Sequence, residues 1–203
     1  MMDAQLAAHA QAATGFMPPA EGMALYETAA QYAATGPVLE IGSYQGKSTI
    51  YLAAGARPQV TVTVDHHRGS EEHQPGWEYH DPSLIDGRSG RIDTLPGLRA
   101  TLHQAGLEDD VVVIVARSQL LARVWHQPLG LLFIDGGHTD EQAQADYEGW
   151  ARHVAGNGAL AIHDVFADPA DGGQAPYRVY LRALADGFTE RRREGSLRIL
   201  VRQ

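Results

Sequence analysis

The sequence predicts an α/β fold in which helices cover both faces of a mostly parallel sheet. Runs rich in Val, Ile and Leu alternate with longer segments of helical character. The first of these runs leads into a glycine-containing turn that opens a helix, and several later runs end in an acidic residue. The carboxyl ends of parallel strands lie along one edge of a sheet, where such folds bind ligands. With 203 residues, 44% of them hydrophobic, the chain has enough material for one packed domain, residues 1–203.

The N-terminal segment, residues 1–35, is expected to form two helices that cover the domain. Residues 5–13 are rich in alanine, and the bend Phe16-Met17-Pro18-Pro19 separates them from a second helix over residues 20–34. Gly36-Pro37 ends that helix, because proline cannot continue it. The apolar residues of both helices would suit a packed cover for the active site or the interface of a homodimer.

A short central part of the chain is expected to carry the first two strands. Residues 38–41 form the first strand, residues 47–54 a helix, and residues 60–64 a second strand that ends in Asp65. The lid segment, which we define as residues 66–90, is polar and contains several Gly and Pro residues. Twenty-five residues without regular structure are long for a compact domain, and such segments are usually functional or mobile.

The second half of the chain repeats the alternation of strands and helices. Thr139 is followed three residues later by Gln142, the spacing of a capping box at the start of a helix. The last two strands are separated by Glu194-Gly195, which predicts an antiparallel pair. The strands are expected over residues 111–115, 129–134, 159–162, 188–193 and 197–201, and the helices over residues 91–104, after Ser118, from Thr139 and over residues 177–185.

The turn after the first strand has the features of a nucleoside-binding site. Gly42 and Gly46 let the backbone bend sharply and approach a ligand closely. Asp65, at the tip of the second strand, is placed to accept hydrogen bonds from ribose hydroxyls. The turn matches neither G-x-G-x-x-G nor the phosphate-binding P-loop, so a nucleoside without phosphates fits better.

The motifs E-I-G-S-Y-Q-G-K-S and T-V-D resemble the first two motifs of class I S-adenosylmethionine-dependent methyltransferases. The resemblance covers nearly the whole chain from Gly36 and implies a Rossmann-like fold with a mostly parallel seven-stranded sheet and a C-terminal antiparallel hairpin. It also implies S-adenosylmethionine as the cofactor, with the glycine turn at its methionine part and Ser118 at the adenine amine. The residues expected to bind the cofactor are Glu40, Gly42, Ser43, Gly46, Ser48, Asp65, Ser118 and Asp135.

Acidic residues after the fourth and fifth strands predict a divalent cation site. Asp135 and Asp164 would end neighbouring strands, and two close carboxylates repel each other unless a proton or a metal ion lies between them. Carboxylate oxygens suit Mg²⁺, whereas a histidine ligand such as His163 or His138 would favour Mn²⁺ or another transition ion. The alternative is that Asp135 caps a helix and Asp164 lies on the surface without a metal.

The segments I-D-G-G-H and I-H-D-V resemble the pattern of metal-assisted small-molecule O-methyltransferases, which include sugar and macrolide-sugar enzymes. The resemblance implies that Asp135 and Asp164 hold Mg²⁺ against an acceptor hydroxyl. His163 stands where the macrolide-sugar enzymes have an acid. His138 is the candidate general base, because imidazole titrates near neutral pH. Capping of the following helix, or metal binding alone, is the alternative role for His138.

The lid segment is expected to bind a sugar-containing small molecule or an oligosaccharide. Aromatic faces stack on sugar rings and polar side chains bind hydroxyls, and such a loop can close over a site and exclude water. The run from Asp65 to Asp81 also resembles that of actinobacterial sugar O-methyltransferases that act on a 1-hydroxyl in methylmannose polysaccharide synthesis. A solvated linker or a dedicated metal site are the alternatives. The candidate acceptor-binding residues are His66, His67, Glu72, Trp77 and Tyr79.

Composition excludes several other classes of protein. The chain has no cysteine, so it can form neither a disulfide framework nor a thiolate metal site. A net charge of −9 argues against a nucleic acid partner, whose phosphates would be repelled. No segment reaches the length of a transmembrane helix, and the N-terminus does not read as a signal peptide. We therefore expect a cytoplasmic protein without a membrane partner.

Two functions other than methyl transfer fit the sequence less well. A nicotinamide or nucleotide-sugar oxidoreductase is disfavoured, because the third glycine of G-x-G-x-x-G and a Tyr-x-x-x-Lys pair are both missing. A catalytically silent cofactor-binding module is disfavoured by the set Asp135, His138 and Asp164, which a sensor would not need.

Overall fold

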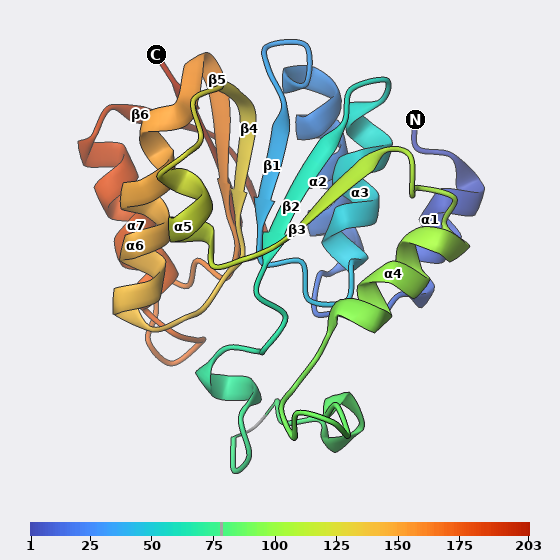
Figure 1. The fold of residues 1–203 in the computed structure, drawn as a ribbon. Coiled ribbons are helices and arrows are strands. Elements are labelled where there is room, and N and C mark those ends of the chain that lie inside the picture. Colours follow the sequence, from blue (N-terminus) through green and yellow to red (C-terminus); the bar gives the residue numbers. More distant parts are fainter. Residues whose placement is uncertain (78) are drawn as a thin grey trace.

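The computed structural model describes residues 1–77 and 79–203 and has a seven-stranded sheet as its middle layer (Figure 1). The strand order is β3-β2-β1-β4-β5-β7-β6. Strands β1 to β5 pair in parallel, and β7 is antiparallel to both β5 and β6. The strands are β1 (Val38–Ile41), β2 (Thr61–Asp65), β3 (Val111–Val115), β4 (Leu129–Ile134), β5 (Val154–Ile162), β6 (Phe188–Glu194) and β7 (Leu197–Arg202).

Helices cover both faces of the sheet, as the alternation in the sequence predicts (Figure 1). One face packs against α1 (Ala4–Ala12), α2 (Pro19–Tyr32), α3 (Lys47–Ala56) and α4 (Leu95–Gln104). The other face packs against α5 (Ser118–Ala122), α6 (Asp140–Trp150) and α7 (Ala175–Ala185). Three short 3₁₀ helices, η1 (Glu71–His73), η2 (Pro82–Leu84) and η3 (Ala151–His153), complete the assignment for the described residues.

The central strands are apolar on both faces because each face meets a layer of helices. Along β4, Leu131 and Phe133 lie in the core formed with α1 to α4. The alternate residues Leu132 and Ile134 lie in the core formed with α5 to α7. Every residue of β1 and of β4 is buried. The predicted α/β fold with its C-terminal antiparallel pair is therefore confirmed.

The sheet has its switch point between β1 and β4. The chain leaves β1 toward β2 on one side, whereas β4 pairs with β1 on the other side. The connections after these two strands diverge and leave a crevice at their carboxyl ends, where open α/β sheets bind ligands. The lid segment extends beyond this same edge, at the bottom of Figure 1.

The observed elements differ from the expected ones mainly at their ends. The helix expected over residues 91–104 begins at Leu95, because Ile92 pairs with Ile85 in an isolated bridge. Strand β5 begins at Val154 rather than at residue 159, because Val154 already pairs with Leu129 before an irregularity in register. Within the described part of the chain, no helix combines the length and the apolar character needed to cross a membrane.

Gly42 is required where the turn after β1 passes the end of β4. Its φ of 88° lies in the left-handed region, and a Cβ atom there would overlap the carbonyl oxygen of Asp135. Gly187 offers a matched comparison: its φ is 93°, and a Cβ atom there would meet nothing within 4 Å.

We expect Gly42→Ala to lower the free energy of unfolding by at least about 3 kcal/mol, because backbone strain and steric overlap add. Gly187→Ala should cost about 1 kcal/mol, which is the strain alone. Urea denaturation of the two variants measures the difference. Equal losses in the two variants would contradict the close approach of the turn after β1 to the end of β4.

Candidate active site

A cavity of about 1070 Å³ lies at the carboxyl ends of β1, β2 and β4. Its wall is formed by the bend before α2, the glycine turn, the lid segment, the start of α5 and the loops after β4 and β5. The predicted site residues that line it are Gly42, Ser43, Ser48, Asp65, His66, Glu72, Tyr79, Ser118, Asp135, His138, His163 and Asp164. The structure therefore brings most of the predicted residues to one place.

Glu40, predicted to bind the cofactor, instead lies beneath the cavity. It is fully buried, and its carboxylate accepts hydrogen bonds from the hydroxyls of Ser48 (2.6 Å), Thr49 (2.6 Å) and Thr63 (2.7 Å). Burial raises the pKa of Glu40 to about 7, although the three hydroxyl bonds oppose the rise. Its side chain joins β1, β2 and α3 below the glycine turn and has no contact with the cavity.

Three other predicted residues also fall outside the wall of the cavity. Gly46 is the N-cap of α3 and has a φ of 93°, which the turn requires. His67 is buried, and its Nδ1 lies 2.7 Å from Oγ1 of Thr94. Trp77 is exposed. Of the aromatic residues predicted in the lid segment, Tyr79 alone therefore faces the cavity.

Asp65 ties the glycine turn to the start of the lid segment. One carboxylate oxygen accepts from the backbone N–H groups of Ser43 (3.2 Å) and Tyr44 (3.0 Å), and the other accepts from that of His67 (2.7 Å). A carboxylate has about four lone-pair sites, so these three bonds leave room for one further donor. Asp65 can therefore fix the turn and still accept a bond from a ligand.

Two buried polar atoms in the wall have no hydrogen-bond partner among the described residues. One is Oγ of Ser43, in the glycine turn, and the other is Nε2 of His73, in the lid segment. Buried polar groups are rarely left without a partner, so each such group needs an explanation. Because both residues line the cavity, a bound ligand is the explanation that fits the geometry.

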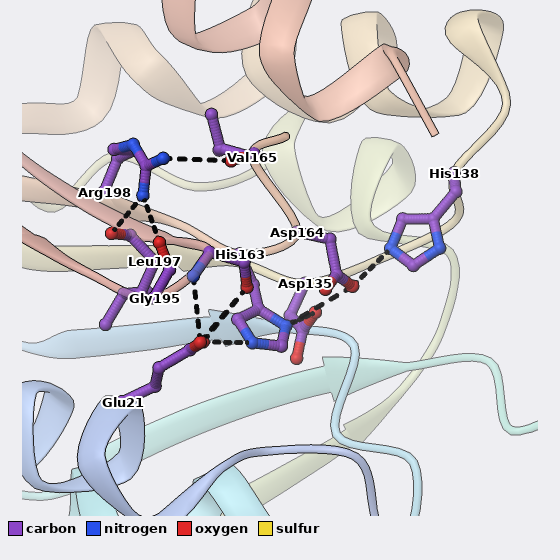
Figure 2. A network of polar contacts seen from close by, with 10 residues as sticks. Glu21, Asp135, His138, His163, Asp164, Val165, Gly195, Leu197 and Arg198 are labelled. Atoms are coloured by element: carbon purple, nitrogen blue, oxygen red, sulfur yellow. Dashed lines mark hydrogen bonds and ion pairs between the residues drawn. The ribbon is translucent and has the colours of Figure 1, made fainter. Parts of the chain in front are cut away.

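A network of acids and histidines forms the other side of the site (Figure 2). His163 is buried, with Nε2 2.7 Å from Oε2 of Glu21 and Nδ1 3.0 Å from Oδ1 of Asp135. His138 lies nearer the opening, with Nε2 3.2 Å from Oδ2 of Asp164 and Nδ1 2.9 Å from Oε1 of Glu72. The network runs from α2 through the ends of β4 and β5 to the lid segment.

The carboxylates hold both histidines in the protonated state. Burial disfavours the charged imidazolium of His163, but Asp135, Asp164 and Glu21 outweigh burial and keep the pKa of His163 far above its ordinary value. Burial also opposes the charge on His138, and Asp164 and Glu72 nevertheless raise the pKa of His138 to about 10. The pKa of Asp164 is lowered because its two histidine partners outweigh the effect of burial.

His163, a predicted metal ligand, contacts carboxylates through both of its ring nitrogens. His138 likewise faces Glu72 and Asp164, so either imidazole would have to lose its proton and one carboxylate contact before it could bind a metal ion. The group of side chains that could hold an ion consists of Asp135, His138 and Asp164, whose ligand atoms all lie within 4.8 Å of one another. Two carboxylates and one imidazole suit Mg²⁺ or Mn²⁺, so the residues present fit a divalent cation.

The backbone of Asp164 is held in an uncommon conformation by the C-terminal hairpin. Its φ is 54°, in the left-handed region. The backbone N–H of Val165, the residue after Asp164, donates a hydrogen bond to the carbonyl of Ser196 (3.0 Å). The side chain of Arg198 donates to the carbonyl of Val165 (3.1 Å) and also to the carbonyls of Gly195 and Leu197 (Figure 2). These bonds fix the direction in which Asp164 points.

Sequence reasoning missed several residues of the site. Glu21 reaches the network from a helix expected only to cover the domain, and Asp146 lines the cavity from the middle of α6. Phe16 packs against the lid residue Tyr79 and Tyr44 packs against the lid residue His73, with ring centroids 5.2 and 5.4 Å apart. An acid among the apolar positions of a helix, as at Glu21 and Asp146, was the available signal.

Comparison with known proteins gives the following matches. Residues 39–165 match the family described as methyltransferase domain. The catechol O-methyltransferase of Mycobacterium tuberculosis is 32% identical over 128 residues, which cover 63% of this chain and 46% of that protein. The chain thus spans a little under half the length of this curated relative.

Two solved structures share the fold. Cofactor-bound Rv0187 from MTB superposes with a TM-score of 0.65 at 24% identity, over 97% of this chain and 87% of that one. The O-methyltransferase from Bacillus cereus in complex with SAH superposes with a TM-score of 0.64 at 20% identity, over 100% and 92% of the two chains. At these identities the likeness establishes the fold alone.

The buried carboxyl of Glu40 should make stability depend on pH. Between pH 4.5 and pH 7 the folded protein keeps a proton that the unfolded chain has released, so the contribution of Glu40 is full below pH 4.5 and is lost as the pH rises through 7. Relative to Glu40→Gln, which cannot titrate, the wild type should lose about 3 kcal/mol of unfolding free energy over this range. Urea denaturation of both proteins at several pH values measures this loss. A difference between wild type and variant that does not change with pH would contradict the raised pKa of Glu40.

The pairing of Glu21 with His163 should contribute strongly to stability, because Glu21 is the carboxylate that faces Nε2 of this buried imidazolium. We expect Glu21→Gln to lower the free energy of unfolding by about 2–4 kcal/mol at neutral pH. Glu27→Gln, on the exposed side of the same helix, removes a surface pair with Arg192 and should cost less than about 1 kcal/mol. Chemical denaturation compares the two; similar losses would show that Glu21 is an ordinary surface acid.

Proposed function

The chain belongs to the methyltransferase domain family, and we propose that it transfers the methyl group of S-adenosylmethionine to a hydroxyl group of a sugar or a sugar-containing small molecule. The observation that carries the proposal is the shape of the site. One cavity is lined both by the glycine turn and Asp65 and by the set Asp135, His138 and Asp164. A cofactor and an acceptor that share this cavity would meet at its middle.

The residues at the glycine turn fit the cofactor. S-adenosylmethionine supplies an electrophilic methyl group on its sulfonium. Gly42 and Ser43 would lie along its methionine part, where the hydroxyl of Ser43 lacks a partner among the described residues. Asp65 would accept a hydrogen bond from the ribose with its remaining lone pair. Ser118 would lie beside the adenine base of the cofactor.

The acids at the ends of β4 and β5 fit a divalent cation, which Asp135 and Asp164 would hold with their carboxylates. Bound there, Mg²⁺ or Mn²⁺ would lower the pKa of an acceptor hydroxyl and orient it. His138 is also the group placed to take up the hydroxyl proton. It carries a proton while it contacts both Glu72 and Asp164, so it becomes a base only when one of those contacts is lost.

The polar character of the lid segment supports a sugar acceptor. His66, Glu72 and Tyr79 face the cavity, and the orphaned Nε2 of His73 adds a further hydrogen-bonding group. A catechol is the second candidate, because a relative that is 32% identical over 128 residues is a catechol O-methyltransferase. Both acceptors offer two adjacent hydroxyls, which suit chelation to one cation.

Calorimetric binding and a methyl-transfer assay test the proposal together. S-adenosylhomocysteine should bind with micromolar affinity, and acceptor binding from a panel of mannosides and catechols should require Mg²⁺ or Mn²⁺. Asp164→Asn, which tolerates the positive φ, should keep S-adenosylhomocysteine binding and lose about 100-fold or more of turnover.

Asp109→Asn is the matched control, since Asp109 is exposed and does not line the cavity. It should keep full activity. Absence of S-adenosylhomocysteine binding would overturn the proposed activity. Full turnover of Asp164→Asn in the presence of a chelator would overturn the role of the cation and leave the methyl transfer intact.

A further inference from the structure

Asp146 is a buried acid of α6 that lines the cavity. Its residue surface is 4% exposed, and it lies on α6 among core residues such as Tyr147. Its Oδ1 accepts hydrogen bonds from the hydroxyl of Ser118 and from the side-chain amide of Gln119 (2.7 Å). Packing of α6 against the sheet does not need a carboxylate at this position, so the presence of a buried acid has to be explained in another way.

The second oxygen of Asp146 is the atom available to a ligand. Oδ2 takes no hydrogen bond from any described residue, and Asp146 forms part of the cavity wall. Gly136 leaves space beside it: a Cβ atom on Gly136 would lie 2.7 Å from Oδ2. Burial raises the pKa of Asp146 to about 6 although the bond from Ser118 opposes the rise, which is consistent with an acid that still lacks a donor.

Asp146 and Ser118 together present two hydrogen-bond acceptors, so they suit a ligand that donates two hydrogen bonds. Ser118 gives its own proton to Asp146, so its oxygen is left as an acceptor beside the carboxylate oxygen. Ser118 follows β3, the neighbour of β2, whose tip carries Asp65. A nucleoside with its ribose at Asp65 would therefore have its base on the side of Ser118 and Asp146, which line the same cavity.

On these grounds, and resting on the proposed function, we propose that Asp146 accepts a hydrogen bond from the exocyclic amine of the cofactor's adenine and makes the site selective for adenine. The amine has two N–H bonds, which match the two acceptors, Oδ2 of Asp146 and Oγ of Ser118. Hypoxanthine has a carbonyl oxygen at the same ring position, and this oxygen would face two acceptors without a hydrogen between them. The site rejects such a base because buried acceptors are left unpaired.

Calorimetry with S-adenosylhomocysteine and S-inosylhomocysteine tests the proposal on the full chain. The wild type should bind the inosine analogue at least about tenfold more weakly than the adenosine compound, the loss expected for a hydrogen bond to a charged group. Asp146→Asn can donate to the carbonyl of the inosine analogue, so the ratio of the two dissociation constants should fall to about threefold or less. Glu141→Gln, an exposed acid in the first turn of the same helix, should keep the wild-type ratio.

The ratio on one protein sample is independent of how much a variant loses in overall stability. Should Asp146→Asn fail to fold in thermal melting, Ser118→Ala is measured instead, and it should also reduce the ratio because it removes one acceptor. Equal affinities of the wild type for the two compounds overturn the inference, whatever the variants do. An unchanged ratio in a folded Asp146→Asn also overturns it. A wild type that binds neither compound overturns the proposed function itself, which is a separate result.

Discussion

The imidazolium of His163 is the interaction on which the rest of the site depends. It lies between Glu21, Asp135 and Asp164, three carboxylates that would repel one another without a cation between them. The three acids raise the pKa of His163, and His163 in turn lowers the pKa of Glu21 against the effect of burial. A proton held by the protein thus allows Asp135 and Asp164 to lie together at the ends of neighbouring strands, open to the cavity.

This arrangement joins parts of the chain that are far apart in sequence. Glu21 comes from α2 and also accepts from the backbone of Ser196 in the C-terminal hairpin, while Arg198 of that hairpin holds Val165 beside Asp164. On the solvent side, His138 connects Asp164 to Glu72 of the lid segment. Helix α2, the hairpin and the lid segment therefore all contact the residues that position the two carboxylates.

The fold could be predicted from the sequence because the strands are apolar runs with clear ends. The bounds of β1, β3 and β4 match their predictions, since each is closed by a turn or a polar residue. The gathering of Asp65, Ser118, Asp135 and Asp164 at one edge followed from the same pattern. The sequence could not tell a buried polar residue that serves the fold from one that serves a ligand: Glu40 and His67 turned out to bind neighbouring hydroxyls. Nor could it predict Glu21, whose partner His163 is 142 positions away.

The most direct test of this account is a nitrogen–proton correlation spectrum of the histidine side chains at about pH 8, where an ordinary histidine is neutral. His163 is assigned by comparison with His163→Gln, and His138 by comparison with His138→Gln. The account predicts that both ring nitrogens of His163 carry a proton at this pH and continue to do so as the pH is raised further. A neutral His163, with one unprotonated ring nitrogen, would contradict it and would make that nitrogen available to a metal ion.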